Sequence, residues 1–252
     1  EIGACDWSSD VCSSDLEAPD EDTFREHARF YFNHLPRLTT RPEHIKQLRQ
    51  TILNLAVRGK LVPQDPDDEP ASELLKQYAE VAPERKRRRS PEDCLSIPEP
   101  FPIPESWQWV QIGDICLCCE YGTSKKATVT SQGVPVLTMG NIQDGEVFIG
   151  NQKRIPSNCP DLPQLFLMKN DILYNRTNSA ELVGKTGIFR GESVKITFAS
   201  YLIRLQFNTE YFRPEYINVA MNAPYFRETQ IIPNLKQQCG QANVNGTKLQ
   251  HM

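Results

Sequence analysis

The sequence has few histidines, no long apolar run and no basic leader. Each absence argues against one kind of protein or catalytic site. Only four histidines occur in 252 residues, at positions 27, 34, 44 and 251, so the long stretch between the last two has no imidazole for a Ser-His-Asp or Cys-His site. No segment approaches the roughly 20 apolar residues that a membrane-spanning helix needs. The N-terminus also lacks the basic and apolar regions of a secretory signal. We therefore expect a cytoplasmic protein with no membrane association.

Cysteine and glycine spacing disfavours a metal site and a nucleotide site. The eight cysteines include one Cys-x-x-Cys pair, Cys116 and Cys119, with no second pair to complete four zinc ligands, so we interpret them as reduced thiols. Val183–Gly187 resembles the end of a phosphate-binding loop, but Ser179 stands where that motif requires glycine. Asp171 precedes a predicted strand without the second carboxylate of a metal-dependent nuclease, and we interpret it as a turn residue.

Acidic residues are unevenly distributed along the chain. The net charge is -4, yet residues 1–22 hold eight acids and no base, which leaves +4 for the other 230 residues. Asp6–Leu16 has no helix or strand period and resembles a translated sequencing adapter, so we set residues 1–22 aside as a non-native or disordered leader. Residues 100–252 hold 14 bases and 12 acids. This small surplus neither requires nor excludes an anionic partner.

A helical segment is predicted over residues 23–82. Its first part, Thr23–Leu35, is aromatic-rich and predicts a short helix or a packing arm limited by Pro36. A capping box at Thr40–Glu43 and a left-handed C-cap at Gly59 bound the next helix. Its apolar stripe has helical spacing and consists of Ile45, Leu48, Ile52 and Leu55. A second helix has its apolar face at Ala71, Leu74, Leu75 and Tyr78. Both stripes need another partner, either the downstream domain or a second chain.

The remainder of the chain predicts a linker and then an α+β domain. Residues 83–103 are basic and proline-rich; the run 85–89 is typical of a solvated linker, with phosphate contact as the alternative. From 104 to 245, short β-leaning segments predict a mixed, β-rich domain with a central irregular sheet. The expected strands are 107–112, 134–138, 171–174, 186–190 and 201–207. A helix is expected over 214–222, with Tyr216, Val219 and Ala220 on one face.

Polar side chains gather in three places within this domain. They are the loop Tyr121–Lys126, the run Asn175–Ser179 and the amide-rich segment 237–245. Arginine pairs with guanine edges and asparagine or glutamine with adenine edges, while lysine, serine and threonine suit phosphates. Loops are polar in most proteins, so each cluster alone is a weak indication of nucleic-acid binding.

Taken in order along the chain, these segments resemble the DNA-specificity (S) subunit of type I restriction-modification enzymes. The resemblance covers most of residues 39–245. Its stretches are TTRPEHIKQLRQTILNLAVRGKLVPQDPDDEPASELLK (39–76), PESWQWVQIGDI (104–115), EYGTSKKA (120–127), GVPVLTMGNIQDG (133–145), DILYNRTNSAELVGKTGIF (171–189), ASYLIRL (199–205) and GQANVN (240–245).

The resemblance implies a non-catalytic subunit that binds double-stranded DNA. Residues 23–82 would form a conserved helical spacer and 104–245 one target-recognition domain, with 246–252 as the truncated start of the next helical segment. Such a domain reads one half of a bipartite target and positions the modification (methyltransferase) and restriction subunits. Those partners carry S-adenosylmethionine, ATP and magnesium, so no cofactor or metal is expected on this chain. A single recognition domain fits a gene fragment or a half-subunit, with self-association expected through the helical segment.

By analogy with the family, we expect DNA contacts and no catalytic residues in the loop 121–126 and the run 175–178, with Lys185 as a phosphate contact. The candidates are Tyr121, Thr123, Ser124, Lys125, Lys126, Asn175, Arg176, Thr177, Asn178 and Lys185. One alternative is a nuclease or methyltransferase domain that acts on DNA itself. The missing histidines, cofactor loop and paired carboxylates disfavour that alternative. The other is a structural adaptor whose helices recruit partners.

Overall fold

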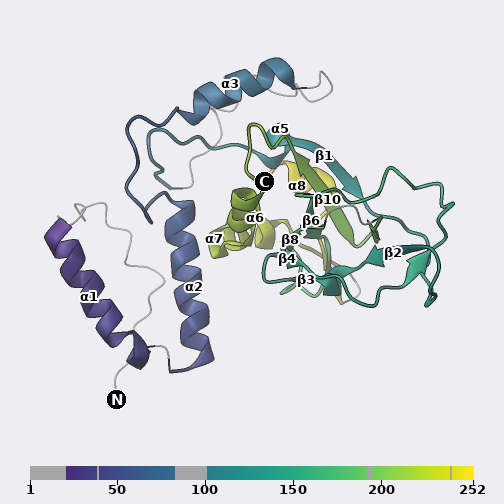
Figure 1. The fold of residues 1–252 in the computed structure, drawn as a ribbon, viewed down its shortest axis with the longest axis horizontal. Helices are drawn as coiled ribbons and strands as arrows, with labels where there is room; N and C mark the ends of the chain where they lie inside the picture. Colours follow the sequence, from purple (N-terminus) through teal and green to yellow (C-terminus); the bar gives the residue numbers. More distant parts are fainter. Residues whose placement is uncertain (1–20, 39, 83–100, 192–194, 239) are drawn as a thin grey trace. The chain divides into compact units, whose positions relative to one another are not determined.

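Figure 1 shows the computed structural model of the chain, which describes residues 21–38, 40–82, 101–191, 195–238 and 240–252. The chain divides into two compact units, Glu1–Arg49 and Gln50–Met252. The basic run 85–89, most of the predicted linker and residues 1–20 of the predicted leader lie outside the described residues. No described helix is both long enough and apolar enough to cross a membrane.

The first unit contains helix α1 (Glu21–Leu38) and the start of α2 (Pro42–Val57). The helix alternative predicted for Thr23–Leu35 is confirmed, but the helix is longer than predicted, because α1 starts at Glu21 and continues through Pro36 to Leu38. Pro36 lies in the last turn, where its missing N–H removes a hydrogen bond close to the helix end. Helix α2 starts one residue later than the predicted capping box requires, with Pro42 in the first helical position that proline favours.

The predicted C-cap of α2 is confirmed in the second unit. Gly59 has a φ of 66°, its N–H donates to the Ala56 carbonyl at 3.1 Å and the Lys60 N–H donates to the Leu55 carbonyl at 2.9 Å. This pair of bonds is the Schellman motif. Helix α3 (Ala71–Val81) follows and buries Tyr78, whose ring meets Phe212 edge-on at 4.8 Å.

A six-stranded sheet forms the centre of the second unit. Its order is β1 (Cys116–Tyr121), β10 (Leu202–Phe207), β6 (Ile172–Asn175), β8 (Thr186–Ile188), β4 (Glu146–Val147) and β3 (Ile142–Gln143). All pairs are antiparallel except β4 with β8. Strand β6 is buried on both faces, with Ile172 and Tyr174 in one hydrophobic cluster and Leu173 in another. A continuous apolar run is the pattern of such a two-sided strand.

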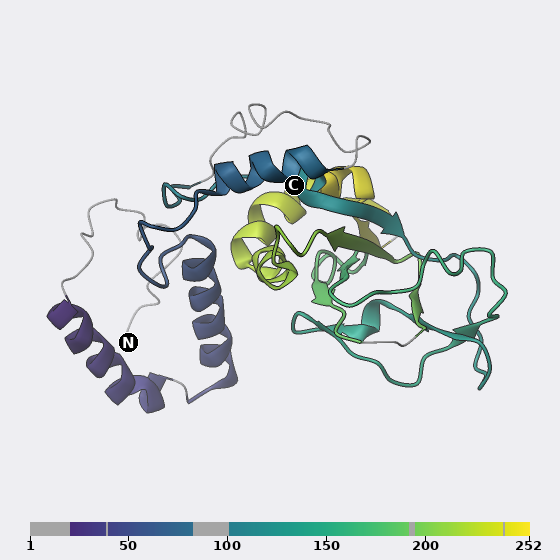
Figure 2. The ribbon, with the colours of Figure 1, turned by 45° about the horizontal axis from the view of Figure 1, so that its top comes forward.

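Two three-stranded sheets and several short helices complete this unit. One sheet has the order β11 (Lys236–Gln238), β12 (Gln241–Asn243), β7 (Thr177–Asn178), and the other β5 (Arg154–Ile155), β2 (Val134–Leu137), β9 (Thr197–Phe198). The helices are α5 (Ile112–Ile115), η2 (Met139–Asn141), α6 (Pro214–Asn222), α7 (Pro224–Phe226), η3 (Arg227–Ile231), η4 (Ile232–Asn234) and α8 (Gly246–Gln250). Of these helices, α6 and α7 lie side by side next to the central sheet (Figures 1 and 2). Helix α8 contacts α5 and β1 and buries Leu249 completely.

Four of the five predicted strands are confirmed, and the strand at 107–112 is wrong. Residues 107–111 are irregular and Ile112 begins α5, while the strand itself starts at Cys116. The apolar content of this stretch serves ring packing instead of a ladder. Trp109 meets Phe101 edge-on at 4.8 Å, and the Trp107 indole donates to the Gln64 side chain at 2.9 Å.

The helix predicted over 214–222 is confirmed as α6, and the face that it buries is not the one that carries Tyr216, Val219 and Ala220. The buried residues are Pro214, Ile217, Asn218 and Met221, while Tyr216 is 45% exposed. Asn218 sets this orientation, because it accepts a bond from Thr186 Oγ1 at 2.8 Å and donates to the Gly145 carbonyl at 2.7 Å. A polar anchor of this kind is not visible to a search for apolar periodicity.

Candidate nucleic-acid interface

Backbone hydrogen bonds bring two of the predicted polar places together at the edge of the central sheet. The Thr123 N–H donates to the Phe198 carbonyl at 2.9 Å, and the Ser200 N–H donates to the Thr123 carbonyl at 2.9 Å. On the other side, the Arg176 N–H donates to the Tyr201 carbonyl at 3.0 Å. The segment 198–201 therefore joins the loop after β1 to the residue after β6.

The third polar place reaches the same region through the sheet β11-β12-β7. Asn243 pairs with Thr177, and its side-chain amide donates to Thr177 Oγ1 at 2.7 Å. The next residue, Val244, donates its N–H to the Arg176 carbonyl at 3.0 Å. We call the joined surface the Arg176 cluster: Tyr121, Ser124, Lys125, Lys126, Arg176, Thr177, Asn178 and Tyr201.

Arg176 is held in place without a carboxylate partner in the described part of the chain. Its guanidinium lies 4.8 Å from the centre of the Tyr121 ring, and Nη1 donates to the Ser200 carbonyl at 3.3 Å. The Tyr121 hydroxyl in turn accepts a bond from the Gly246 N–H at 2.7 Å. Stacking on an aromatic face fixes the guanidinium while leaving its charge unneutralised. Arg176 is therefore a positioned cation.

The basic loop Ser124–Lys126 is exposed because the residues before it anchor it to the fold. A Cβ at Gly122 would meet the Phe198 and Ala199 carbonyl oxygens, so only glycine permits this close approach. Thr123 is buried; its hydroxyl donates to Asp161 at 2.5 Å and accepts from the Lys125 N–H at 3.1 Å. Thr123 therefore shapes the loop and lies beneath its surface.

Asn175 is also buried, and its contacts are internal. Its side-chain amide donates to the Leu182 carbonyl at 3.2 Å, and its main-chain carbonyl accepts from the Gly184 N–H at 2.9 Å. Gly184 has a φ of 94°, the left-handed conformation that glycine adopts most readily. These bonds close the turn after β6. Lys185, at the end of that turn, is exposed.

Burial thus divides the ten predicted contact residues into two groups. Thr123 and Asn175 are buried and bonded within the domain, so neither offers an exposed side chain for the predicted DNA contact. The other eight are exposed or half-buried, and DNA contact by them stays a prediction. Tyr201, at 47% exposure beside Arg176, was missed. Its position at the start of a predicted strand gave no sign that the side chain faces solvent.

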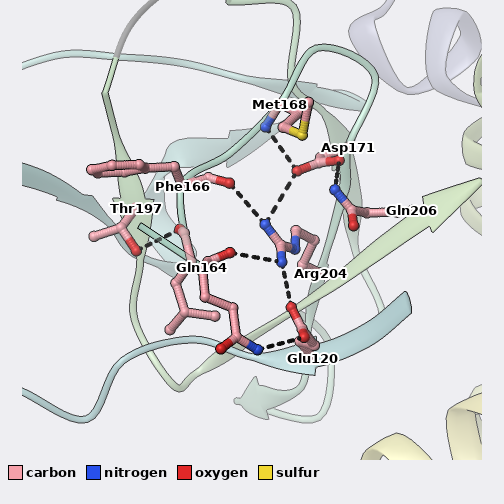
Figure 3. Close-up of polar contacts among 9 residues, drawn as sticks. Glu120, Gln164, Phe166, Met168, Asp171, Thr197, Arg204 and Gln206 are labelled. Atoms are coloured by element: carbon pink, nitrogen blue, oxygen red, sulfur yellow. Dashed lines mark hydrogen bonds and ion pairs between the residues drawn. The ribbon is translucent and has the colours of Figure 1, made fainter. Parts of the chain in front are cut away.

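A second polar group lies inside the domain, around Arg204 on β10 (Figure 3). The Arg204 guanidinium donates to Glu120, to the Phe166 carbonyl at 2.8 Å and to the Gln164 carbonyl at 3.1 Å. Asp171 lies 3.8 Å away on the other side of the guanidinium. We call these three charged residues the Arg204 network. The prediction of Asp171 as a simple turn residue was incomplete, because it is 3% exposed and paired.

Electrostatics of the Arg204 network follow from burial and pairing. Burial raises the pKa of Asp171, although bonds from the Met168 N–H and the Gln206 amide oppose the shift. Burial would also raise the pKa of Glu120, but its hydrogen bonds and the Arg204 charge lower it below the ordinary value. Burial and neighbouring Glu120 raise the pKa of the Cys118 thiol to about 12. Cys118 is therefore protonated at neutral pH and a poor nucleophile.

The carboxylates around Arg204 do not gather into a metal site. Within the described residues, no group of three or more histidine, cysteine, aspartate and glutamate side chains could hold a metal ion. Cys116 and Cys119 lie on β1 and form no disulfide with another described cysteine. The Arg204 network instead ties together β1, β6 and β10 with the segment 164–168.

Comparison with known proteins relates the chain to one class of proteins. It is 38% identical over 147 residues to the type I restriction enzyme EcoAI specificity subunit of Escherichia coli, covering 56% of this chain and 25% of that protein. It is 31% identical over 195 residues to the EcoEI specificity subunit of the same organism, covering 73% and 33%. The chain thus spans a quarter to a third of the length of these curated relatives. No protein-family model matches it.

Two solved structures show a more distant likeness. One is a chain from a structure of a type I R-M system, with 15% identity, a TM-score of 0.43 and coverage of 93% of this chain and 47% of that one. The other is the HsdS subunit from Thermoanaerobacter tengcongensis, with 16% identity, a TM-score of 0.41 and coverage of 90% and 45%. Both TM-scores lie below 0.5, so these structures add nothing to the sequence relationship.

Proposed function

We propose, because the chain is a homologue of type I restriction enzyme specificity subunits, that it binds double-stranded DNA and reads one half of a bipartite target. The sequence relationship to the two curated E. coli subunits carries this proposal. The Arg176 cluster supplies a surface with suitable chemistry. It combines one positioned guanidinium, exposed lysines and amide or hydroxyl side chains around a stacked tyrosine.

Within the Arg176 cluster, the side chains divide by the part of DNA they suit. Arg176 can pair bidentately with a guanine edge, and Asn178 suits an adenine edge. Lys125, Lys126 and the nearby Lys185 suit phosphates, which fix position without reading sequence. Tyr201 and Tyr121 add flat apolar faces beside the arginine. Base preference would therefore rest on the Arg176 side of the surface and general affinity on the lysines.

The chain acts in this proposal as a non-catalytic subunit in the cytoplasm. It would position methyltransferase and restriction subunits that themselves carry S-adenosylmethionine, ATP and magnesium. The apolar stripe of α2 offers a surface for such assembly, because Ile45, Leu48, Ile52 and Leu55 are 37–42% exposed. We expect self-association through this stripe when partners are missing. A monodisperse monomer in sedimentation velocity would contradict that expectation.

Selection from a random duplex pool tests the proposed function. The full chain is mixed with the pool, bound DNA is separated by gel shift, and both fractions are sequenced. We expect enrichment of a short contiguous half-site in intact DNA. Cleaved or methylated product would instead support an enzyme. Absence of any shift at low salt would contradict DNA binding and favour an adaptor.

A further inference from the structure

A cavity outside the Arg176 cluster has the chemistry of a phosphate site. It has a volume of about 370 Å³ and lies beside the sheet β5-β2-β9. Its walls include Arg154, Gly133 and the hydroxyl-bearing residues Thr128, Thr130 and Ser157. No acidic residue lines it. Such a lining offers hydrogen-bond donors and a positive charge to an anion.

Arg154 is fixed at this cavity by both its backbone and its side chain. Its main chain exchanges two hydrogen bonds with Thr128, at 2.8 and 2.9 Å, and it pairs with Pro135 of β2 on the other side. Its Nη1 donates to the Gly133 carbonyl at 2.8 Å. No carboxylate pairs with Arg154 among the described residues. A held guanidinium with unused donors loses little freedom when it binds an anion.

The charge of the surrounding sequence favours an anion as well. The continuous segment 122–160, which contains the cavity lining, holds two acids, Asp144 and Glu146, and four bases. The bases are Lys125, Lys126, Lys153 and Arg154. Residues 100–252 as a whole have nearly balanced charge, with 14 bases and 12 acids. The exposed loop of the Arg176 cluster leads directly into the cavity, since Lys126 lies two residues before Thr128.

We propose that this cavity binds a phosphate group of the DNA backbone, with the Arg154 guanidinium as its main contact and the hydroxyls of Thr130 and Ser157 beside it. This inference rests on the proposed function. A phosphate held here lies beyond the surface proposed to read bases, so it contributes affinity and register without sequence preference. The shared chemistry also admits free phosphate, and the experiment separates the two sources.

Salt-dependent DNA binding of two neighbouring charge variants tests the proposal. In the full chain, Arg154→Gln removes the positive charge at the cavity and leaves a shorter, uncharged amide side chain. Lys153→Gln removes the same charge from the adjacent exposed residue, which does not line the cavity. We expect only Arg154→Gln to lower the salt slope by about one ion, so that its loss of affinity between 50 and 200 mM salt is about threefold smaller than that of wild type. The effect should be equal for all duplexes.

A second arm uses inorganic phosphate alone. Nuclear magnetic resonance should show phosphate-dependent shifts of the Gly133 and Thr130 amides that Arg154→Gln abolishes and Ser157→Ala weakens. Equal effects of Arg154→Gln and Lys153→Gln on DNA, or no phosphate-dependent shift in wild type, would overturn the proposal. If phosphate shifts these amides but no variant alters DNA binding, the assignment to the DNA backbone is overturned. If wild type binds phosphate here and no DNA at all, the proposed function fails separately.

Discussion

Two arginines at the central sheet have opposite environments. Arg204 is 4% exposed and paired with Glu120 and Asp171, and it also donates to two carbonyl oxygens. Arg176 is half-buried on the Tyr121 ring, and its guanidinium donates to the Ser200 carbonyl. Both side chains are positioned. Only the charge of Arg176 remains available for a ligand.

The difference separates a stabilising role from a binding role. A buried charge must be compensated within the protein, because an unpaired ion in the interior is costly. A positioned charge at the surface is compensated by water until an anionic partner replaces that water. We therefore assign the Arg204 network to stability and the Arg176 cluster to recognition. Substitutions at the two arginines should affect different measurements.

The largest effect is expected from Arg204→Met. The substitution leaves Glu120 and the buried Asp171 without their counter-charge, which should lower the free energy of unfolding by about 3–5 kcal/mol. Denaturant unfolding measures this change. Arg190→Met is the control, because its pairs with Glu146 and Glu215 are exposed and should contribute about 0–1 kcal/mol. Equal losses of unfolding free energy in Arg204→Met and Arg190→Met would contradict the stabilising role of the Arg204 network.

A smaller effect, on binding, is expected from Arg176→Ala. It should weaken binding to the preferred half-site by about 1–3 kcal/mol and flatten base preference. Lys125→Ala should weaken binding to every duplex alike. Fluorescence anisotropy with matched and scrambled duplexes separates the two outcomes. Unchanged affinity and preference in Arg176→Ala would remove Arg176 from the proposed interface.

The smallest effect is a pH dependence of stability from Glu120. Its lowered folded pKa means that the carboxylate stabilises the fold above its unfolded pKa and that this contribution is lost as the pH falls through the folded pKa. Glu120→Gln should therefore cost about 1 kcal/mol near neutral pH. The difference from wild type should shrink below about pH 4.

Asp171→Asn supplies the control of opposite sign. Because the folded pKa of Asp171 is raised, its contribution is present below its unfolded pKa and is lost as the pH rises through the folded pKa. The stability of wild type relative to Asp171→Asn should accordingly decline as the pH rises. Parallel pH profiles for the two variants would show that the carboxylates are not distinguished by their environments.

The elements that sequence predicted well are those with an unambiguous local signal. Gly59 ends α2 because a left-handed cap needs glycine, and the apolar-rich segments of β6 and β10 became central strands. The stretch 107–112 also has large apolar residues, but its Trp109 and Trp107 rings pack against Phe101 and the distant Tyr216. Local pattern alone cannot distinguish these two uses of apolar side chains.

The candidate site was predicted only in part, because local sequence does not show which polar side chains face solvent. Polar runs in the sequence identified the loops that converge, and Lys125, Arg176 and Lys185 are exposed or half-buried there. Thr123 and Asn175 belong to the same runs, but their side chains point inward. Thr123 bonds to Asp161, which is distant in the sequence, and Asn175 bonds to the Leu182 carbonyl across a turn. Whether a polar residue faces solvent depends on such contacts, which composition does not contain.

Cross-linking of the full chain to an enriched duplex tests the central claim most directly. After selection of a half-site, DNA with photoreactive bases is cross-linked and the attached peptides are identified by mass spectrometry. We predict attachment to the peptides that contain residues 121–126 and 176–178. Attachment confined to α3 or α6, or no enriched half-site from which to begin, would contradict the assignment of recognition to the Arg176 cluster.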